Sequence, residues 1–327
     1  MSSNNIAEQI ERLWKELVVK TPEVLVDKEN QVSDIVLNQY QIDRSHMGPY
    51  FFENLEISGQ GTTGADIYGP RTLFPSTDVP ILFQPMSRAE LEKYPILASK
   101  QPRMMHYDPA IQGESRRDQK TYIYQWAYHL MNWVEDSVGQ CSARENARTL
   151  DERLNRRRKL KNIYWPDPFY LGCELFGAYP SVHDHWGAIL RIEPDMVDGH
   201  RIYPHLTIGL ALSHCGKESS MLYEELAVII SAMQCRALQP RVPEDEALFE
   251  EDIETIKTMP RENGDEKTFP LLLLSFPGPQ NFRYFHVCMR GTRMLILQSK
   301  LYSFEKEETA PIELLVRLAM SQPLSEN

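Results

Sequence analysis

Two runs of alternating residues, 183–193 and 201–214, constrain the fold of this chain more than any other feature of its sequence. In both runs the odd positions are mostly polar and the even positions are mostly apolar. Successive side chains of a β-strand point to opposite faces of the sheet. Each run therefore predicts a half-buried strand with one polar face and one apolar face.

The register between these two strands decides whether their polar faces coincide. Asp198-Gly199 lies between the runs and is typical of a β-hairpin turn. A two-residue turn would set odd positions against even positions, so we prefer a three-residue loop, 198–200, or a bulge with the same effect. The preferred register gives these opposed pairs: Glu193 with His205, Arg191 with Thr207, and Asp195 with Tyr203.

The shared polar face supplies candidate catalytic residues, because histidine is the side chain that titrates near neutral pH. We expect His205 and Glu193 to form an acid–base pair. The other candidates on this face are His183, His185, Arg191 and Tyr203. A solvated polar face without chemistry is one alternative, and a metal held by His183 and His185 is another.

Residues 118–138 predict a helix that is rich in aromatic side chains. Such side chains either belong to the core or line a cavity for a hydrophobic ligand. Together with one residue of the first strand, they give the candidate substrate-binding set Tyr122, Trp126, Trp133 and Trp186.

A glycine pattern at 59–64 matches the dinucleotide-binding fingerprint, but Gly69-Pro70 follows where that motif needs a helix. We interpret 59–64 as a flexible loop, with a pocket lid as the functional alternative.

The remaining elements show no regular alternation of strands and helices. Helices are predicted at 6–18, 88–94 (with Ser87 as its cap), 143–162, 218–238 and 311–320, and a β-meander at 269–276, 282–289 and 292–302. This combination predicts an α+β fold with a curved, largely antiparallel sheet and helices packed on one side. We expect one domain over 1–327, with an N-terminal helical arm (1–21) and an acidic surface connection (242–267).

The composition disfavours some classes of binding partner. The net charge of -11 disfavours binding to nucleic acid or to anionic membranes. The sequence shows neither a signal peptide pattern nor an apolar run of membrane-spanning length, and its five cysteines lack zinc-site spacing. We therefore expect a cytoplasmic protein with reduced thiols. The first helix either packs on the body or forms a homodimer contact.

The stretch FPLLLLSFPGPQNFRYFHVCMRG, with LYSFEK after it, resembles a segment of uncharacterised proteins of ascomycete fungi. The resemblance covers the C-terminal third and rests on core and turn residues, so it implies a shared fold. Some proteins of this kind lie in biosynthetic gene clusters, and a few catalyse cofactor-free cyclisations, as the norbornene synthases do. The resemblance assigns no catalytic residue.

These observations together predict an enzyme of fungal secondary metabolism that needs no cofactor, a cyclase or isomerase acting on a hydrophobic small molecule, with pericyclic cyclisation as one form. Binding in an apolar pocket would orient the substrate, and polar groups would stabilise developing charge. The alternatives are a non-enzymatic binding or scaffold protein, and a metal-dependent enzyme that uses the His-x-His strand.

Overall fold

The computed structural model describes residues 3–20, 26–47, 80–94, 116–140, 154–163, 176–178, 185–195, 203–241 and 258–324. The structural statements that follow concern these residues. The 59–64 glycine pattern, the Asp198-Gly199 turn and His183 lie outside them.

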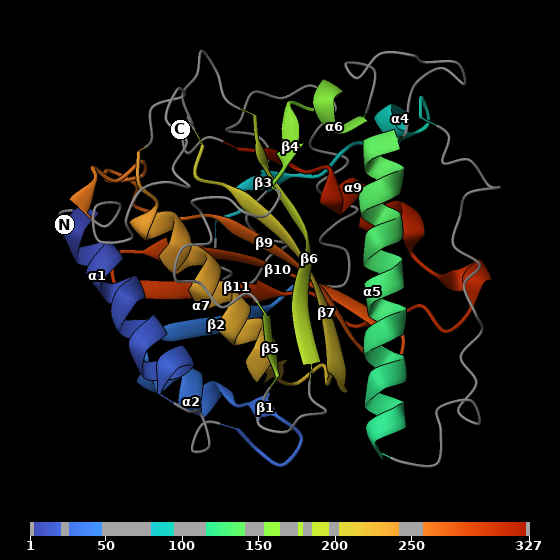
Figure 1. The fold of residues 1–327 in the computed structure, drawn as a ribbon, viewed down its shortest axis with the longest axis horizontal. Coiled ribbons are helices and arrows are strands. Elements are labelled where there is room, and N and C mark those ends of the chain that lie inside the picture. The colour runs from blue at the N-terminus through green and yellow to red at the C-terminus, as the bar shows by residue number, and fades with distance from the viewer. Residues whose placement is uncertain are drawn as a thin grey trace, which may run out of the picture.

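A mixed sheet, nine-stranded in the described part of the chain, forms the centre of the fold (Figure 1). Its order is β2 (Ile42–His46), β11 (Arg293–Gln298), β10 (Asn281–Arg290), β9 (Leu271–Gly278), β7 (Leu206–Cys215), β6 (His185–Pro194) and β4 (Leu160–Asn162). In addition, β5 (Phe176–Ala178) pairs with β6, and β12 (Tyr302–Ser303) pairs with β10. The pairs β7–β9 and β2–β11 are parallel, and the others are antiparallel.

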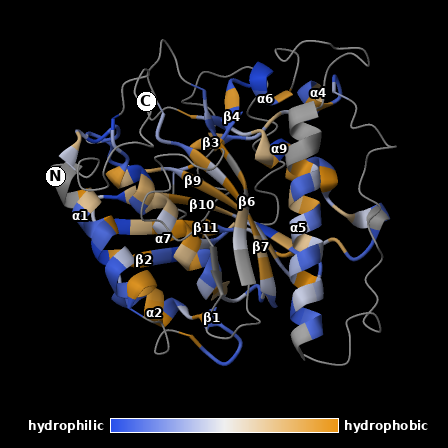
Figure 2. Ribbon diagram, in the orientation of Figure 1, coloured by the Kyte–Doolittle hydropathy of each residue, from blue (hydrophilic) through white to orange (hydrophobic). Residues whose placement is uncertain are grey.

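Helices cover both faces of this sheet. On one face, α1 (Ser3–Trp14) and α7 (Tyr223–Leu238) share a hydrophobic core with the strands. On the other, α5 (Arg116–Gln140) and α9 (Ile312–Ala319) share a second core. The helix α7 is buried over nearly its whole length and is largely hydrophobic (Figure 2), as expected for a helix enclosed on all sides.

The predicted α+β class and the largely antiparallel sheet are confirmed. The structure differs in carrying helices on both faces rather than one. The leucine run of β9 explains the difference, since Leu271 and Leu273 enter the α7 core while Leu272 and Leu274 enter the α5 core. A strand that is apolar on both sides needs cover on both sides.

Several predicted elements are found in the structure. The first helix, α1, continues as a π-helix (Lys15–Val19), and Ser87 caps α4 (Arg88–Leu91) by accepting a hydrogen bond from the Glu90 amide at 3.1 Å. The meander is β9, β10 and β11, and α9 closes the chain as expected. The short elements are β1 (Gln31–Val32) with β8 (Met221–Leu222), β3 (Phe83–Gln84) with β13 (Gln322–Pro323), α2 (Asp34–Gln39) and a 3-10 turn (Glu307–Thr309).

The helix predicted at 143–162 is wrong over its described part. A short helix, α6 (Leu154–Arg157), ends near Lys159, whose φ of 53° is left-handed. The chain then continues as β4, which pairs with β6. A left-handed residue cannot continue a right-handed helix, and pairing at the sheet edge stabilises the extended backbone instead.

The acidic connection 242–267 joins segments of one sheet, because β7 before it and β9 after it are paired strands. No helix in the described ranges combines the length and the hydropathy needed to cross a bilayer.

A buried ion pair joins α7 to the sheet. Arg283 of β10 and Glu225 of α7 are both fully buried, with Nε to Oε1 at 2.8 Å and Nη2 to Oε2 at 2.5 Å. Arg283 also donates to the carbonyls of Lys217 and Ser220, while Glu225 accepts from Ser275 Oγ at 2.6 Å and from the Leu222 amide at 2.7 Å. These bonds compensate the cost of burying two charges.

Two glycines allow α5 to lie close to the strands. A Cβ at Gly209 of β7 would lie 2.4 Å from Met131 Sδ and 2.8 Å from Leu190 Cβ. A Cβ at Gly278, at the end of β9, would lie 2.6 Å from Ile123 Cγ2. The close approach of α5 to the sheet thus depends on the lack of a side chain at these two positions.

Replacing Arg283 with methionine should lower the free energy of unfolding by about 3–5 kcal/mol, because it leaves the Glu225 carboxylate buried and unpaired. Urea unfolding followed by circular dichroism measures this change. The matched control is Arg293→Met, which removes an ion pair with Asp43 at 2.6 Å between side chains that are 60% and 36% exposed. The control should cost less than about 1 kcal/mol, and equal losses in the two variants would contradict the prediction.

Candidate functional site

The two central strands pair as antiparallel neighbours, but a bulge divides their register. Trp186 lies opposite Leu212 and Ala188 opposite Leu210, as the preferred register requires. The register then shifts after Ala188, so that Arg191 lies opposite Ile208. The predicted pairing of Arg191 with Thr207 is therefore wrong by one residue, because β6 carries one extra residue at the bulge.

After the bulge, the side chains of β6 point to the opposite faces of the sheet from those that the alternation predicts. Ala188 belongs to the core on the α7 face, whereas Leu190 and Ile192 belong to the core on the α5 face. Glu193, between Ile192 and Pro194, consequently points toward α7. Its Oε2 accepts from Arg236 of α7 at 2.6 Å, and its Oε1 lies 2.9 Å from Lys161 of β4.

His205 lies just before β7 and interacts with β3 instead. Its Nε2 donates to the carbonyl oxygen of Leu82 at 2.8 Å, and its ring meets Phe83 edge-on at 4.9 Å. Burial lowers the pKa of His205 to about 4, although the Leu82 hydrogen bond and the charge of Glu266 oppose the shift. His205 is thus neutral near pH 7, and its Nδ1 has no hydrogen-bond partner within the described structure.

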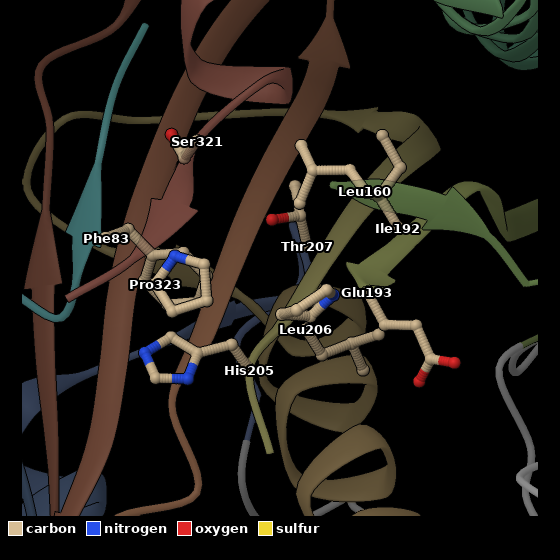
Figure 3. A pocket seen from close by; sticks show the side chains of 10 residues that line it. Phe83, Leu160, Ile192, Glu193, His205, Leu206, Thr207, Ser321 and Pro323 are labelled. Carbon is tan, nitrogen blue, oxygen red and sulfur yellow. The ribbon is translucent and has the colours of Figure 1, made fainter. Parts of the chain in front are cut away.

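Glu193 and His205 do not form the predicted pair. Figure 3 shows the Glu193 carboxylate pointing away from the His205 ring. The link between them is indirect, since Arg236 Nη2 binds Glu193 and also donates to the His205 carbonyl oxygen at 3.3 Å. Tyr203, which is 37% exposed, meets the His205 ring edge-on at 5.9 Å. For His185, Trp186 and Arg191 the structure describes the strand backbone.

A narrow pocket adjoins His205 (Figure 3). It is lined by Phe83, Leu160, Ile192, Glu193, Pro194, His205, Leu206, Thr207, Ser321 and Pro323. Its empty volume, open solvent included, is about 160 Å³. Ligand pockets for small molecules usually measure about 300–1,000 Å³, so this pocket is too small for a substrate in the observed conformation.

The aromatic candidates on α5 lie away from this pocket. Trp133 is a buried member of the core on the α5 face, and Trp126 packs against it with its ring 6.1 Å from that of Phe304. Tyr122 is partly buried. None of these three lines the pocket, so their position favours the core interpretation.

A second buried histidine, His286 of β10, lies near the first. Phe83 separates the two, with its ring centroid 6.0 Å from that of His286. Burial lowers the pKa of His286 to about 4 as well. Both imidazoles are therefore uncharged parts of the folded structure at neutral pH.

Another polar constellation lies away from this pocket, at the carboxyl end of β7. His214 bridges two helices: its Nδ1 contacts Glu224 Oε1 of α7, and its Nε2 lies 3.2 Å from Lys120 Nζ of α5. Glu224 is fully buried, and the His214 side chain is 10% exposed. Among the described residues, the second carboxylate oxygen, Glu224 Oε2, has no hydrogen-bond partner.

The topology brings these three residues together. The parallel strands β7 and β9 end at the same edge, where Cys215 lies opposite Gly278. The crossover helix α7 begins a few residues later, and its second residue, Glu224, reaches back to His214. The N-terminal half of α5 passes this edge, where Ile123 packs against Gly278. The carboxyl ends of parallel strands are where open sheets commonly bind ligands.

The contacts define the proton positions on His214. A carboxylate oxygen only accepts hydrogen bonds, so Nδ1 carries the hydrogen that Glu224 Oε1 accepts. Nε2 then faces the amine of Lys120, and one proton lies between these two nitrogens. This Glu–His–Lys chain has the form of an oriented base beside a reactive side chain, as found in nucleophilic enzymes.

Cys215, the next residue, is a weaker candidate. Burial, followed by the negative charge of Glu29, raises the pKa of its thiol, although Lys120 acts in the opposite sense. The reactive thiolate is therefore disfavoured.

The sequence offered little signal for this site. His214 is separated from Lys120 by 94 positions and from Glu224 by 10. Lys120 and Glu224 fell within predicted helices, where isolated charged residues usually face solvent. The burial of Glu224 could only be recognised once α7 was placed against the sheet.

Among the described residues, no group of three or more His, Cys, Asp and Glu side chains is arranged to hold a metal ion. Comparisons with protein-family models, with curated proteins and with solved structures found no match to this chain.

Acidification should destabilise the protein through His205 and His286. Their folded-state pKa of about 4 lies below the usual value of 6.5, so the unfolded chain binds more protons between these pH values. The stabilisation is complete above pH 6.5 and is lost as the pH falls toward 4. Each histidine should account for a loss on the order of 3 kcal/mol at pH 4.

Urea unfolding of the wild type and of His286→Leu at a series of pH values between 7 and 4 tests this. The variant should show a shallower loss of stability on acidification. His129→Gln, at an exposed position of α5, serves as the control and should follow the wild type. Parallel pH curves for wild type and His286→Leu would contradict the assignment.

Proposed function

We propose that this chain is a cofactor-independent enzyme, an isomerase or cyclase acting on a small molecule, and that Lys120, His214 and Glu224 form its catalytic centre. The observation that carries the proposal is the chain of contacts from the buried Glu224 carboxylate through His214 to the Lys120 amine, with 3.2 Å between the two nitrogens. Isomerisation removes a proton and returns it without change in redox state, so a positioned base suffices.

The roles follow from the geometry. Glu224 is a positioning residue, because its hydrogen bond in the described structure goes to the imidazole and fixes the tautomer of that ring. His214 accepts a proton from the Lys120 ammonium and thereby becomes an imidazolium paired with the carboxylate. Lys120, now an amine, is the group that meets the substrate. A buried carboxylate stabilises this charge arrangement better than water does, since it needs no reorganisation.

The wider class and the hydrophobic substrate remain proposals that rest on sequence. The resemblance of the C-terminal third to uncharacterised ascomycete proteins, some of which lie in biosynthetic gene clusters, is the ground for the isomerase or cyclase class. The pocket beside His205 is a weaker location for the chemistry because of its size.

The ring opening of nitrobenzisoxazole tests for a positioned base. In this reaction a base removes the ring C–H proton, the N–O bond breaks, and a coloured cyanonitrophenolate forms. The wild type should accelerate the reaction at least about tenfold over Lys120→Met, toward the 10²–10⁴ range of positioned bases. Absorbance at pH 7 measures the rate.

Three variants make the result specific. His214→Gln should lose the acceleration, while His129→Gln should keep it. If His205→Gln removes the activity and His214→Gln does not, the base is the residue predicted from sequence. If the wild type and all the variants react at the rate of buffer alone, the binding or scaffold alternative is favoured. Thermal unfolding of each variant checks that it is folded.

A further inference from the structure

We infer that Gln31 of β1 is a positioning residue of the proposed centre, because it joins the end of β7, which carries His214, to the start of α7, which carries Glu224. This inference rests on the proposed function and names a residue that acts through His214 and Glu224 rather than on the substrate. Gln31 is buried, with 6% of its surface exposed. Both its backbone and its side chain take part.

The backbone of Gln31 holds the start of α7. β1 pairs antiparallel with β8, and Gln31 lies opposite Leu222, the residue that precedes the helix. The Tyr223 amide donates to the carbonyl oxygen of Asn30 at 3.0 Å. Glu224 is the next residue along α7, so its position follows from this pairing.

The side chain of Gln31 holds the end of β7. Its Nε2 donates to the carbonyl oxygen of Cys215 at 3.1 Å and to that of Glu29 at 3.3 Å. Its Oε1 accepts from the Ser220 hydroxyl at 2.5 Å, in the loop between β7 and β8. Two carbonyl acceptors at one end of the amide and a hydroxyl at the other assign which end is the nitrogen. One side chain thus fixes both the residue after His214 and the loop that leads to α7.

The strand ladder is irregular at His214. The described pairing of β7 with β6 ends at Leu212, and its pairing with β9 is interrupted between Ala211 and Cys215. His214 lies within that interrupted stretch. The pairing with β9 resumes at Cys215, whose carbonyl oxygen is the one that Gln31 holds. The hydrogen bond from Gln31 therefore supplies a restraint where the regular ladder does not.

The tautomer of His214 reports on this restraint. The Glu224 carboxylate accepts a hydrogen bond and cannot donate one, so contact with it keeps the proton on Nδ1. The proton position of an imidazole is set by the hydrogen bonds of its ring nitrogens. If His214 moves away from Glu224, the Nε2–H form, which predominates in free histidine, becomes populated. A change of tautomer therefore separates a loss of positioning from a simple loss of stability.

Nitrogen NMR of the full-length protein with isotope-labelled histidine measures the tautomer at pH 8. The His214 signals are identified by their absence in His214→Gln, and the wild type should show the Nδ1–H form. Gln31→Met keeps the length of the side chain but removes both hydrogen-bonding ends, so it should shift the His214 resonances toward those of the Nε2–H form. Gln31→Glu should have the same effect, because an ionised carboxylate cannot donate to the Cys215 carbonyl.

Two further variants keep the test decisive. Ser220→Ala removes the donor to Gln31 Oε1 and leaves Gln31 in place, so it should give a smaller shift in the same direction, and it serves if a Gln31 variant does not fold. Gln9→Met is the matched control, because Gln9 is a buried glutamine of α1 whose amide nitrogen has no hydrogen-bond partner among the described residues. It should leave the His214 signals unchanged. Thermal unfolding of each variant shows whether it is folded.

The benzisoxazole assay measures the consequence for catalysis, and Gln31→Met should lower the rate by about tenfold. Wild-type His214 resonances in the folded Gln31 variants and in Ser220→Ala would overturn the inference, whatever their activity, and so would an equal shift in Gln9→Met. A shifted tautomer in a protein without activity above buffer would uphold the role of Gln31 in placing His214 and would remove the proposed function. The two failures are therefore distinguishable.

Discussion

The buried pair between Arg283 and Glu225 fixes the position on which the rest of the structure depends. It joins the first turn of α7 to β10, and the same arginine holds the carbonyls of the preceding loop. Adjacent residues of a helix point in directions about 100° apart, so fixing Glu225 also fixes Glu224. One carboxylate thus serves the fold, and its neighbour reaches His214 at the end of β7.

The strands and most helices could be predicted from the sequence because their periodicity is local. The alternation in 183–193 and 201–214 predicted the strands β6 and β7, and the leucine run within 269–276 predicted β9. The helical cover on both faces was missed, although the leucine run already implied that neither of its sides meets water.

The candidate site was harder to predict from the sequence, for two physical reasons. A single extra residue in β6 reversed the faces of Glu193 and its neighbours, and whether a strand bulges depends on packing that local pattern does not encode. Glu193 consequently forms an ion pair with Arg236 instead of contacting His205. The second reason is distance along the chain, because Lys120, His214 and Glu224 meet only through the β7–α7–β9 crossover and the approach of α5.

The two glycines beneath α5 have a mechanical consequence for Lys120. The α5 side chains Met131 and Ile123 pack directly against the backbone of Gly209 and Gly278, so a larger residue at either glycine would move the helix away from the sheet. The 3.2 Å gap between Lys120 Nζ and His214 Nε2 spans that same interface. A methyl group added at Gly209 would push α5 away from the sheet and would thereby lengthen the distance between Lys120 Nζ and His214 Nε2. The distance between α5 and the sheet thus determines how closely Lys120 approaches His214.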